Sequence, residues 1–180
     1  MRVVENIVVK LLVILFGIFS FNLSYAYSSI YAEESIMENK KSINQCFKEA
    51  SKIYDVPEKV LRAIARVESN KRKYTINVNG KAYYLKSKEK ALEVIMENKR
   101  KSFDIGIMQI NKFWFKRYNY DYELGLDPCW NINMGAYILA YETKRANGNV
   151  IKAIARYHSP KKKHQERYLK KIAIAMQDYK

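Results

Sequence analysis

The sequence predicts one mostly helical α+β domain that contains a small β-hairpin. From residue 42 onward, apolar residues recur every three or four positions, which is the period of amphipathic helices. Asn79-Gly80 separates two short segments of β-forming residues and is the strongest hairpin signal in the chain. The length of 180 residues suits a single domain, and 48% hydrophobic residues are enough for a packed core.

The first 26 residues have the features of a secretory signal peptide. Arg2 and Lys10 give a basic start, residues 11–19 are almost wholly apolar, and residues 24–26 (Ser-Tyr-Ala) form a small-x-small cleavage signal. An uncleaved membrane anchor is the alternative, but the apolar run is well short of the roughly 20 residues that span a bilayer. We therefore expect export and cleavage, with a polar tether over residues 27–41.

Six helices are expected in the domain over residues 42–180. Four of them are expected from their apolar faces, which are Ile43, Cys46, Phe47, Ala50 and Ile53; Val60, Leu61, Ile64 and Val67; Ala91, Leu92 and Ile95; and Leu169, Ile172, Ala173 and Met176. The other two precede the last of these and are expected over Asn131–Ala146 and Val150–Tyr157.

Helix boundaries follow from turn and capping residues. Asp55-Val56-Pro57-Glu58 is interpreted as a capping box with proline in the first turn of the second helix. Ser87 is expected to cap the third helix, and Asp127-Pro128 to precede the fourth. The expected hairpin joins Tyr74–Val78 to Ala82–Leu85, and Phe103–Asn111 is expected to form a strand or a tight loop.

Cys46 and Cys129 are the two cysteines of the chain. In an exported protein, one widely separated pair most simply forms a disulfide. A metal site is poorly supported, because the chain has only two histidines and no Cys or His pair has ligand spacing. A nucleophilic cysteine is favoured still less. We expect neither a metal nor a cofactor.

The chain is strongly basic, with a formal net charge of +15. Such a surface attracts polyanions through its long-range field. Nucleic acid is the first candidate for a cytosolic protein, but export favours cell-wall polymers and lipid headgroups instead. Biased composition alone also produces basic chains, so the charge indicates a class of partner and not a ligand.

Glu68 is the leading candidate for a catalytic side chain. It shares a helix face with Leu61 and Ile64, so it continues an apolar stripe. It also lies near the end of its helix, where the macrodipole disfavours negative charge. Both effects favour the protonated carboxyl that a general acid for glycosidic cleavage requires. The alternative is an ordinary helix-end glutamate that bends into water.

Three motifs resemble those of lytic transglycosylases with a lysozyme-like fold. Residues 65–70 (Ala-Arg-Val-Glu-Ser-Asn) resemble the helix-end Glu-Ser motif of that family. Residues 104–111 (Asp-Ile-Gly-Ile-Met-Gln-Ile-Asn) resemble the second signature, and residues 153–159 (Ala-Ile-Ala-Arg-Tyr-His-Ser) the third, in which a tyrosine ends a helix. The ordered set covers residues 46–168. The size, signal peptide and cysteine pair are similar to small specialised members that accompany secretion systems, conjugation machines and pili.

The resemblance implies cleavage of peptidoglycan between N-acetylmuramic acid and N-acetylglucosamine. Glu68 would protonate the glycosidic oxygen and then accept the proton of the muramic 6-hydroxyl, which closes a 1,6-anhydro ring. Ser69 would support the site beside Glu68, and Tyr157 would form a hydrogen bond near Glu68. Gly106 would let the backbone approach the glycan. Met108 and Gln109 would line the groove. The substrate-binding residues implied in this way are Ser69, Gly106, Met108, Gln109, Asn111 and Tyr157.

Several features depart from the family pattern. Tyr157-His158 replaces the usual Tyr-Asn pair, Pro160 replaces a following glycine, and residues 81–103 lengthen the segment between the first two motifs. A muramidase on the same fold would need a second carboxylate, for which Asp104 is the nearby candidate. We favour the interpretation that Asp104 instead holds a turn through its side chain.

The expected partners are peptidoglycan glycan strands and components of a secretion, conjugation or pilus machine, and not nucleic acid. The protein is expected to act in the periplasm as a monomer. The alternatives are a hydrolytic muramidase and a non-catalytic wall-binding assembly protein.

Overall fold

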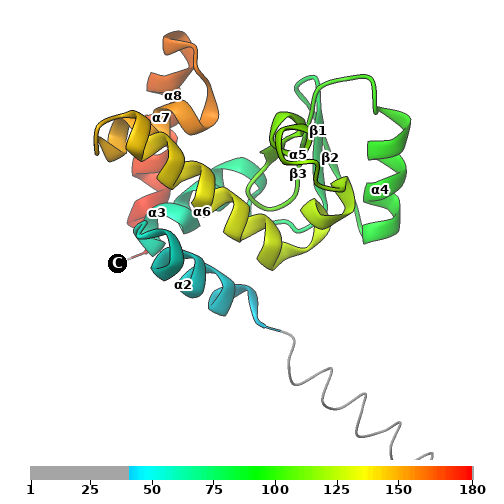
Figure 1. Ribbon diagram of the computed structural model, residues 1–180, viewed down its shortest axis with the longest axis horizontal. Helices are drawn as coiled ribbons and strands as arrows, with labels where there is room; N and C mark the ends of the chain where they lie inside the picture. The colour runs from blue at the N-terminus through cyan, green and yellow to red at the C-terminus, as the bar shows by residue number, and fades with distance from the viewer. Residues whose placement is uncertain (1–40, 180) are drawn as a thin grey trace, which may run out of the picture. The chain divides into compact units, whose positions relative to one another are not determined.

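The structure, a computed structural model, describes residues 41–179, and helices dominate this part of the chain. The expected signal peptide and all of the expected tether except Lys41 lie outside these residues. The elements (Figure 1) are α2 (Ile43–Tyr54), α3 (Glu58–Ser69), β1 (Thr75–Val78), β2 (Lys81–Tyr84), α4 (Lys88–Glu97), β3 (Phe103–Ile105), β4 (Ile110–Asn111), α5 (Lys112–Tyr118), the 3-10 helix η1 (Tyr122–Leu126), α6 (Pro128–Arg145), α7 (Val150–His158) and α8 (Lys162–Gln177). The prediction of a mostly helical α+β domain is confirmed.

The four short strands form one antiparallel sheet in the order β2-β1-β3-β4. Val78 pairs with Lys81, and the two residues between them both have positive φ, 49° at Asn79 and 90° at Gly80. This is the backbone of a tight two-residue hairpin turn, which asparagine and glycine adopt most readily. The predicted hairpin is confirmed, and Phe103–Asn111 forms two short strands, β3 and β4, that are joined by a tight turn.

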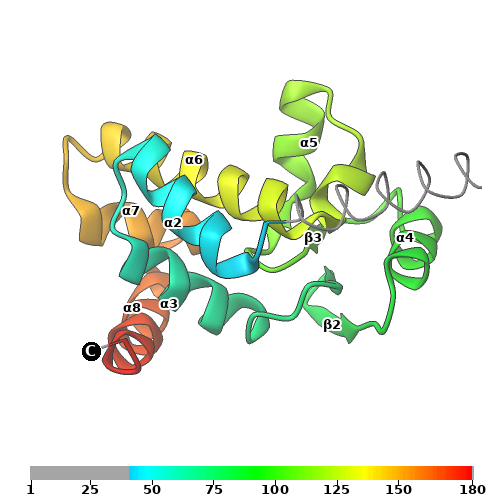
Figure 2. The same cartoon turned by 90° about the horizontal axis from the view of Figure 1, so that it is seen from below.

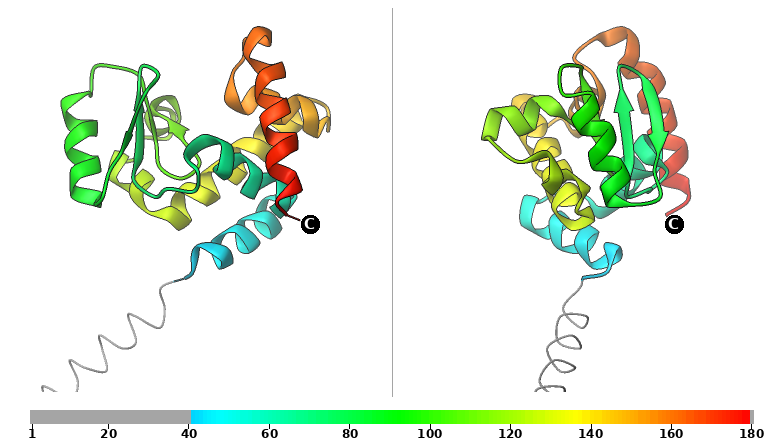
Figure 3. Two further views of the ribbon diagram at one scale, coloured as in Figure 1. Left: turned by 180° about the vertical axis from the view of Figure 1, so that it is seen from behind. Right: turned by 90° about the vertical axis from the view of Figure 1, so that its right-hand side faces the viewer.

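The long helix α6 connects the two ends of the domain over residues 42–179. Figures 1 and 2 show the sheet, α4 and α5 near its N-terminal half and α7 near its C-terminal end, with α8 beyond α7. Helix α2 packs along α6, and α8 packs against α3 and α7 (Figure 3). No helix between residues 41 and 179 is both long and apolar enough to cross a membrane.

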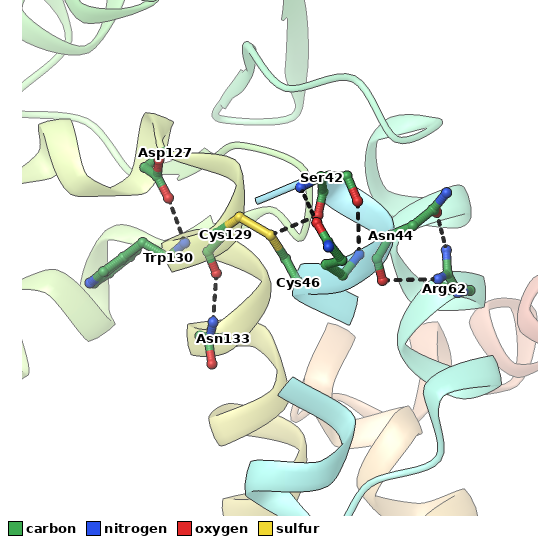
Figure 4. Close-up of a disulfide and its surroundings, with 9 residues drawn as sticks. Ser42, Asn44, Cys46, Arg62, Asp127, Cys129, Trp130 and Asn133 are labelled. Atoms are coloured by element: carbon green, nitrogen blue, oxygen red, sulfur yellow. Dashed lines mark hydrogen bonds between the residues drawn. A yellow bond between two sulfur atoms is a disulfide. The ribbon is translucent and has the colours of Figure 1, made fainter. Parts of the chain in front are cut away.

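A disulfide joins α2 to the first turn of α6. Cys46 and Cys129 are bonded, with their Cα atoms 5.2 Å apart, so the predicted pairing is present (Figure 4). Beside it, the Asp127 side chain accepts a hydrogen bond from the Trp130 backbone nitrogen at 2.7 Å. This cap, with Pro128 in the first turn, starts α6 three residues before the predicted Asn131.

Some sequence predictions are wrong in detail. Asp55 is not part of a capping box, because it adopts a left-handed conformation with φ 50° and ends α2. Helix α3 begins after Pro57 without a side-chain cap. Ile53 is 66% exposed, because the buried face of α2 ends at Ala50.

The buried face of α8 differs from the predicted one. Tyr168, Ile172 and Ala175 are its buried residues, whereas Ala173 is exposed. Helix α5 and the 3-10 helix η1 were not predicted, because each is too short to show a clear period.

Candidate active site

A cleft of about 740 Å³ opens where the end of α3, the β3–β4 turn, α6 and α7 come together. Both acidic and basic side chains line it, together with aromatic and amide groups. The lining residues are Glu68, Asn77, Asp104, Gln109, Ile110, Asn111, Phe113, Trp114, Ile138, Glu142, Arg145, Arg156, Tyr157, His158, Ser159 and Pro160.

Glu68 reaches this cleft from the last turn of α3. Its side chain is only 14% exposed, so it is not the fully wetted helix-end glutamate of the alternative interpretation. Tyr168 Oη donates a hydrogen bond to Glu68 Oε1 at 2.7 Å. His158 Nδ1 lies 3.8 Å from the same oxygen, and its ring stacks on that of Tyr168 with centroids 4.3 Å apart. Two helices from the far end of the chain therefore hold the carboxyl in place.

The two tyrosines near Glu68 remain protonated hydrogen-bond donors. Burial raises the pKa of Tyr168 well above its usual value, and the charge of Glu68 raises it further. Burial, followed by the charges of Glu68 and Asp104, does the same to the pKa of Tyr157. The Tyr157 hydroxyl donates to the Met108 carbonyl at 2.8 Å and not to Glu68. The side chain that bonds Glu68 itself is Tyr168, which was not among the predicted site residues.

Asp104 faces the same cleft as Glu68 and also bonds within the sheet. Its Oδ1 accepts from Asn111 Nδ2 at 2.7 Å, across the β3–β4 register that pairs these two residues. Burial raises the pKa of Asp104, the bond from Asn111 opposes this, and the nearby charge of Glu68 adds to the rise. The charge of Glu68 therefore affects the pKa of Asp104 in the cleft that both residues line.

Ser69 fixes the end of α3 to the β3–β4 turn. It is 3% exposed, and its hydroxyl donates to the Ile107 carbonyl at 2.7 Å. Ser69 does not line the cleft. Its bond to Ile107 supports the backbone beside Glu68.

Asn131, in the first turns of α6, holds the β3–β4 turn in shape. It is 0% exposed, accepts from the Met108 backbone nitrogen at 2.8 Å, and donates to the carbonyls of Ile105 at 2.9 Å and Gly125 at 2.8 Å. Nothing in the sequence pattern marked Asn131, because its partners are more than twenty residues away or in an unpredicted 3-10 helix.

Gly106 and Met108 are both held by contacts inside the protein. Gly106 has φ 81°, and a Cβ there would lie 2.5 Å from Asn131 Nδ2 and 2.6 Å from the Gly125 carbonyl. The close approach that requires glycine is therefore with the chain's own α6 and η1. The Met108 side chain is 0% exposed and packs against Gly135, so it does not line the groove.

Gln109 and Asn111, by contrast, do line the cleft. Gln109 adopts positive φ, 49°, and its Nε2 donates to the carbonyls of Thr75 at 3.0 Å and Gly106 at 2.9 Å. The Asn111 side chain accepts from the Phe113 backbone nitrogen at 2.9 Å and caps α5. Both amides are thus held by the backbone at the cleft wall.

Aromatic and charged side chains complete the cleft. Phe113, which is 55% exposed, and Trp114 line the cleft, and their rings contact each other edge to face with centroids 5.4 Å apart. Trp130 instead packs on Phe115 and Tyr120. Over residues 41–179, no group of three or more His, Cys, Asp or Glu side chains is arranged to hold a metal ion.

The missed tyrosine had a detectable sequence signal. Tyr168, Ile172 and Ala175 are spaced by four and three residues, which is one helix face. The predicted face, which included Leu169, was offset from it by one position. That small error hid the residue that contacts Glu68.

Comparisons with known proteins agree with the motifs. Residues 45–174 match the family model of the transglycosylase SLT domain. The chain is 32% identical over 127 residues to protein IpgF of Shigella sonnei, which covers 67% of this chain and 70% of that protein. It is 32% identical over 152 residues to a peptidoglycan-binding-like protein of Escherichia coli O157:H7, covering 78% and 82% of the two chains. It is also 33% identical over 95 residues to type IV secretion system protein virB1 of Brucella abortus biovar 1, covering 51% and 40%.

Proposed function

Because the chain belongs to the transglycosylase SLT domain family, we propose that it is a lytic transglycosylase that cleaves peptidoglycan glycan strands. The bond cut is the β-1,4 linkage between N-acetylmuramic acid and N-acetylglucosamine, and the product carries a 1,6-anhydro muramic end. The observation that supports this most directly is the position of Glu68, a carboxyl that is 14% exposed in a cleft and held by a phenol.

The proposed reaction needs one carboxyl that acts twice. Protonated Glu68 donates to the glycosidic oxygen, the bond from that oxygen to the muramic C1 breaks, and the N-acetylglucosamine side leaves as an alcohol. The resulting Glu68 carboxylate takes the proton from the muramic 6-hydroxyl, whose oxygen bonds to C1. The carboxyl is thereby restored, and no water is consumed. The Tyr168 hydroxyl stabilises the intermediate carboxylate by donating to Oε1.

A second candidate reaction is hydrolysis by a muramidase. Asp104 lines the same cleft, and the charge of Glu68 affects its pKa, so a second carboxyl is available. In that reaction water replaces the 6-hydroxyl, and Asp104 acts as the second carboxylate. We favour the transglycosylase, because Asp104 is already bonded across the β3–β4 pair by Asn111.

Mass spectrometry of the muropeptides that the purified protein releases from sacculi distinguishes these functions. Anhydro ends are lighter than reducing ends by one water molecule, so anhydro products support the transglycosylase and reducing products support the muramidase. Binding to sacculi without release would identify a non-catalytic wall-binding protein.

Replacing the catalytic carboxyl tests the mechanism. Glu68→Gln is expected to keep the fold and sacculus binding but to abolish release, because an amide cannot donate the proton and then accept it back. Glu93→Gln, an exposed position on α4, is the matched control and should release products at the wild-type rate. Equal release by both variants would remove Glu68 from the mechanism.

We also propose that the protein is exported to the periplasm and opens the wall for a secretion or pilus machine. The signal-like residues 1–26 support export, and the similarity to a protein named as part of a type IV secretion system supports the partner. Fractionation of the producing cells, with N-terminal sequencing of the periplasmic protein, is expected to give a chain that begins at Tyr27. A protein found only in the cytoplasm with residue 1 intact would contradict this.

A further inference from the structure

The solvent-facing side of α8 carries a stripe of four cations, here called the α8 stripe. Lys163, Arg167 and Lys170 are spaced by four and three residues, so they lie on one face of the helix, and Lys171 lies beside them. All four residues are exposed. The buried face of the helix, which includes Tyr168, packs against α3 and α7. The stripe therefore faces solvent and takes no part in the core.

Positive charge is concentrated on α8 and is balanced on other exposed helices. Residues 161–178 contain six Lys and Arg residues but only two Asp and Glu residues, and Glu166 pairs with Lys170 at 3.0 Å. Helix α4, by comparison, contains two lysines and three glutamates, and Lys90 pairs with Glu93 at 2.8 Å. The excess charge on α8 is thus a local feature and does not follow from the basic composition alone.

The first turn of α8 places cations where a helix disfavours them. Lys161 is the N-cap residue and makes no side-chain cap, Lys162 and Lys163 follow it, and no acidic residue lies in this turn. The N-terminal end of the helix dipole is positive, so these cations destabilise the helix. Helices α6 and α7 begin instead at Asp127 and Asn149, whose side chains cap them. A cost that the helix itself does not offset indicates that the charge serves binding.

An exposed apolar side chain lies on the same face as the stripe. Ile174 is 66% exposed and follows Lys170 by four residues and Arg167 by seven. Cations beside an exposed apolar residue suit a bilayer surface, where the cations meet phosphate headgroups and the apolar group reaches the acyl boundary. An anionic polymer would use the cations but has no comparable use for the isoleucine.

The position of α8 fits a flat partner. Figures 1 and 2 show this helix at the edge of the domain, at the opposite end from α4. None of residues 161–179 lines the cleft that contains Glu68. The stripe is therefore separate from the candidate active site, and a surface can approach it without entering the cleft.

We propose that the α8 stripe, together with Ile174, binds the surface of a membrane that contains anionic phospholipids. The contact holds the protein beside the membrane while Tyr168, on another face of α8, keeps its hydrogen bond to Glu68. This proposal goes beyond the proposed reaction and depends on the proposed export, which brings the protein to the membrane surfaces that border the cell wall.

Sedimentation with vesicles tests this contact. The protein is used in the cleaved form that starts at Tyr27, so that residues 11–19 do not supply the membrane contact. Binding is expected to vesicles of phosphatidylcholine with phosphatidylglycerol and not to phosphatidylcholine alone, and it should weaken as salt screens the exposed charges. Equal binding to both kinds of vesicle, or binding to neither, would overturn the proposal.

Two triple variants of equal net charge locate the contact. The first replaces three cations of the stripe and leaves the ion-paired Lys170 in place: Lys163→Gln, Arg167→Gln and Lys171→Gln. The control replaces three exposed cations at the other end of the domain: Lys86→Gln, Lys99→Gln and Arg100→Gln. The stripe variant should bind anionic vesicles about 100-fold more weakly than the wild type, because each cation near the surface contributes about five-fold. The control should bind as the wild type does, and equal losses in both would overturn the stripe.

The apolar residue distinguishes a membrane from an anionic polymer. Ile174→Ser should weaken binding to anionic vesicles about five-fold, because an apolar side chain no longer enters the bilayer. Ile151→Ser is the matched control, because Ile151 is 68% exposed on α7 and lies outside the stripe. An Ile174 variant that binds vesicles as tightly as this control would contradict insertion into a membrane.

Sacculi provide the alternative ligand and separate this proposal from the proposed function. The stripe variant should bind sacculi and release muropeptides as the control does, because the stripe does not line the cleft. Weaker binding to sacculi with unchanged binding to vesicles would assign the stripe to wall carboxylates and overturn the proposal. A wild type that binds anionic vesicles but releases nothing from sacculi would overturn the proposed function and leave the membrane contact intact.

Discussion

Replacing Asn131 by alanine tests how the cleft is held together. The side chain is 0% exposed and makes three hydrogen bonds to backbone groups, those of Ile105, Met108 and Gly125, at 2.8–2.9 Å. Alanine leaves one N–H and two carbonyls without these partners, each at about 1–3 kcal/mol, and also opens a small cavity. We expect a loss of about 3–5 kcal/mol in the free energy of unfolding, near the upper end for a single substitution.

The assay is equilibrium unfolding in urea with the disulfide intact, and the free energy is obtained by linear extrapolation. Asn133→Ala is the matched control, because Asn133 lies on the same helix, is only partly buried, and makes one hydrogen bond to the Cys129 carbonyl at 2.9 Å. It should change stability by less than about 1 kcal/mol.

A small effect would refute this account of the site. If Asn131→Ala lowers the free energy of unfolding no more than Asn133→Ala does, the three hydrogen bonds do not hold the β3–β4 turn. The position of the Met108 carbonyl, which accepts a hydrogen bond from Tyr157, then needs another explanation. A large loss of stability with full activity at low temperature would show instead that the turn reforms without Asn131.

Three other outcomes are expected. Reducing the Cys46–Cys129 disulfide, which links residues 83 positions apart, should lower the free energy of unfolding by about 3–5 kcal/mol. The measurement is urea unfolding with and without reductant, and no change would mean that the loop is already constrained without the disulfide. Tyr168→Phe should lower kcat about 10- to 100-fold with little change in melting temperature, because Glu68 loses its donor; an unchanged kcat would exclude this contact from the reaction. Asp104→Asn keeps the side-chain oxygen that accepts a hydrogen bond across the β3–β4 pair. Burial raises the pKa of Asp104 in the folded protein. The wild type therefore loses stability as the pH rises from about 3.9, the ordinary pKa of an aspartate, through the raised pKa of the folded state. The variant should therefore be at least as stable as the wild type at pH 7 and equal to it near pH 3, and a variant that is less stable at pH 7 alone would contradict the sign.

Local features of the fold could be predicted because their causes are local. Asn79-Gly80 allows positive φ at two adjacent residues, so the hairpin position follows from the dipeptide itself. Ser87 caps α4 by accepting from Lys90 three residues on. The ordered motifs around Glu68 likewise indicated the family from short segments.

The sequence by itself therefore determined the fold class, the hairpin, the single cysteine pair and the candidate acid. Tertiary structure decided what surrounds that acid, because those contacts join residues far apart in the chain. Tyr168 reaches Glu68 across 100 positions, and Asn131 reaches the Met108 backbone across 23. Helical period fixes a face only to within about one residue, which is enough to bury a helix but not to aim the Tyr168 hydroxyl at Glu68. Such directions are set by the packing of α6, α7 and α8 around the cleft.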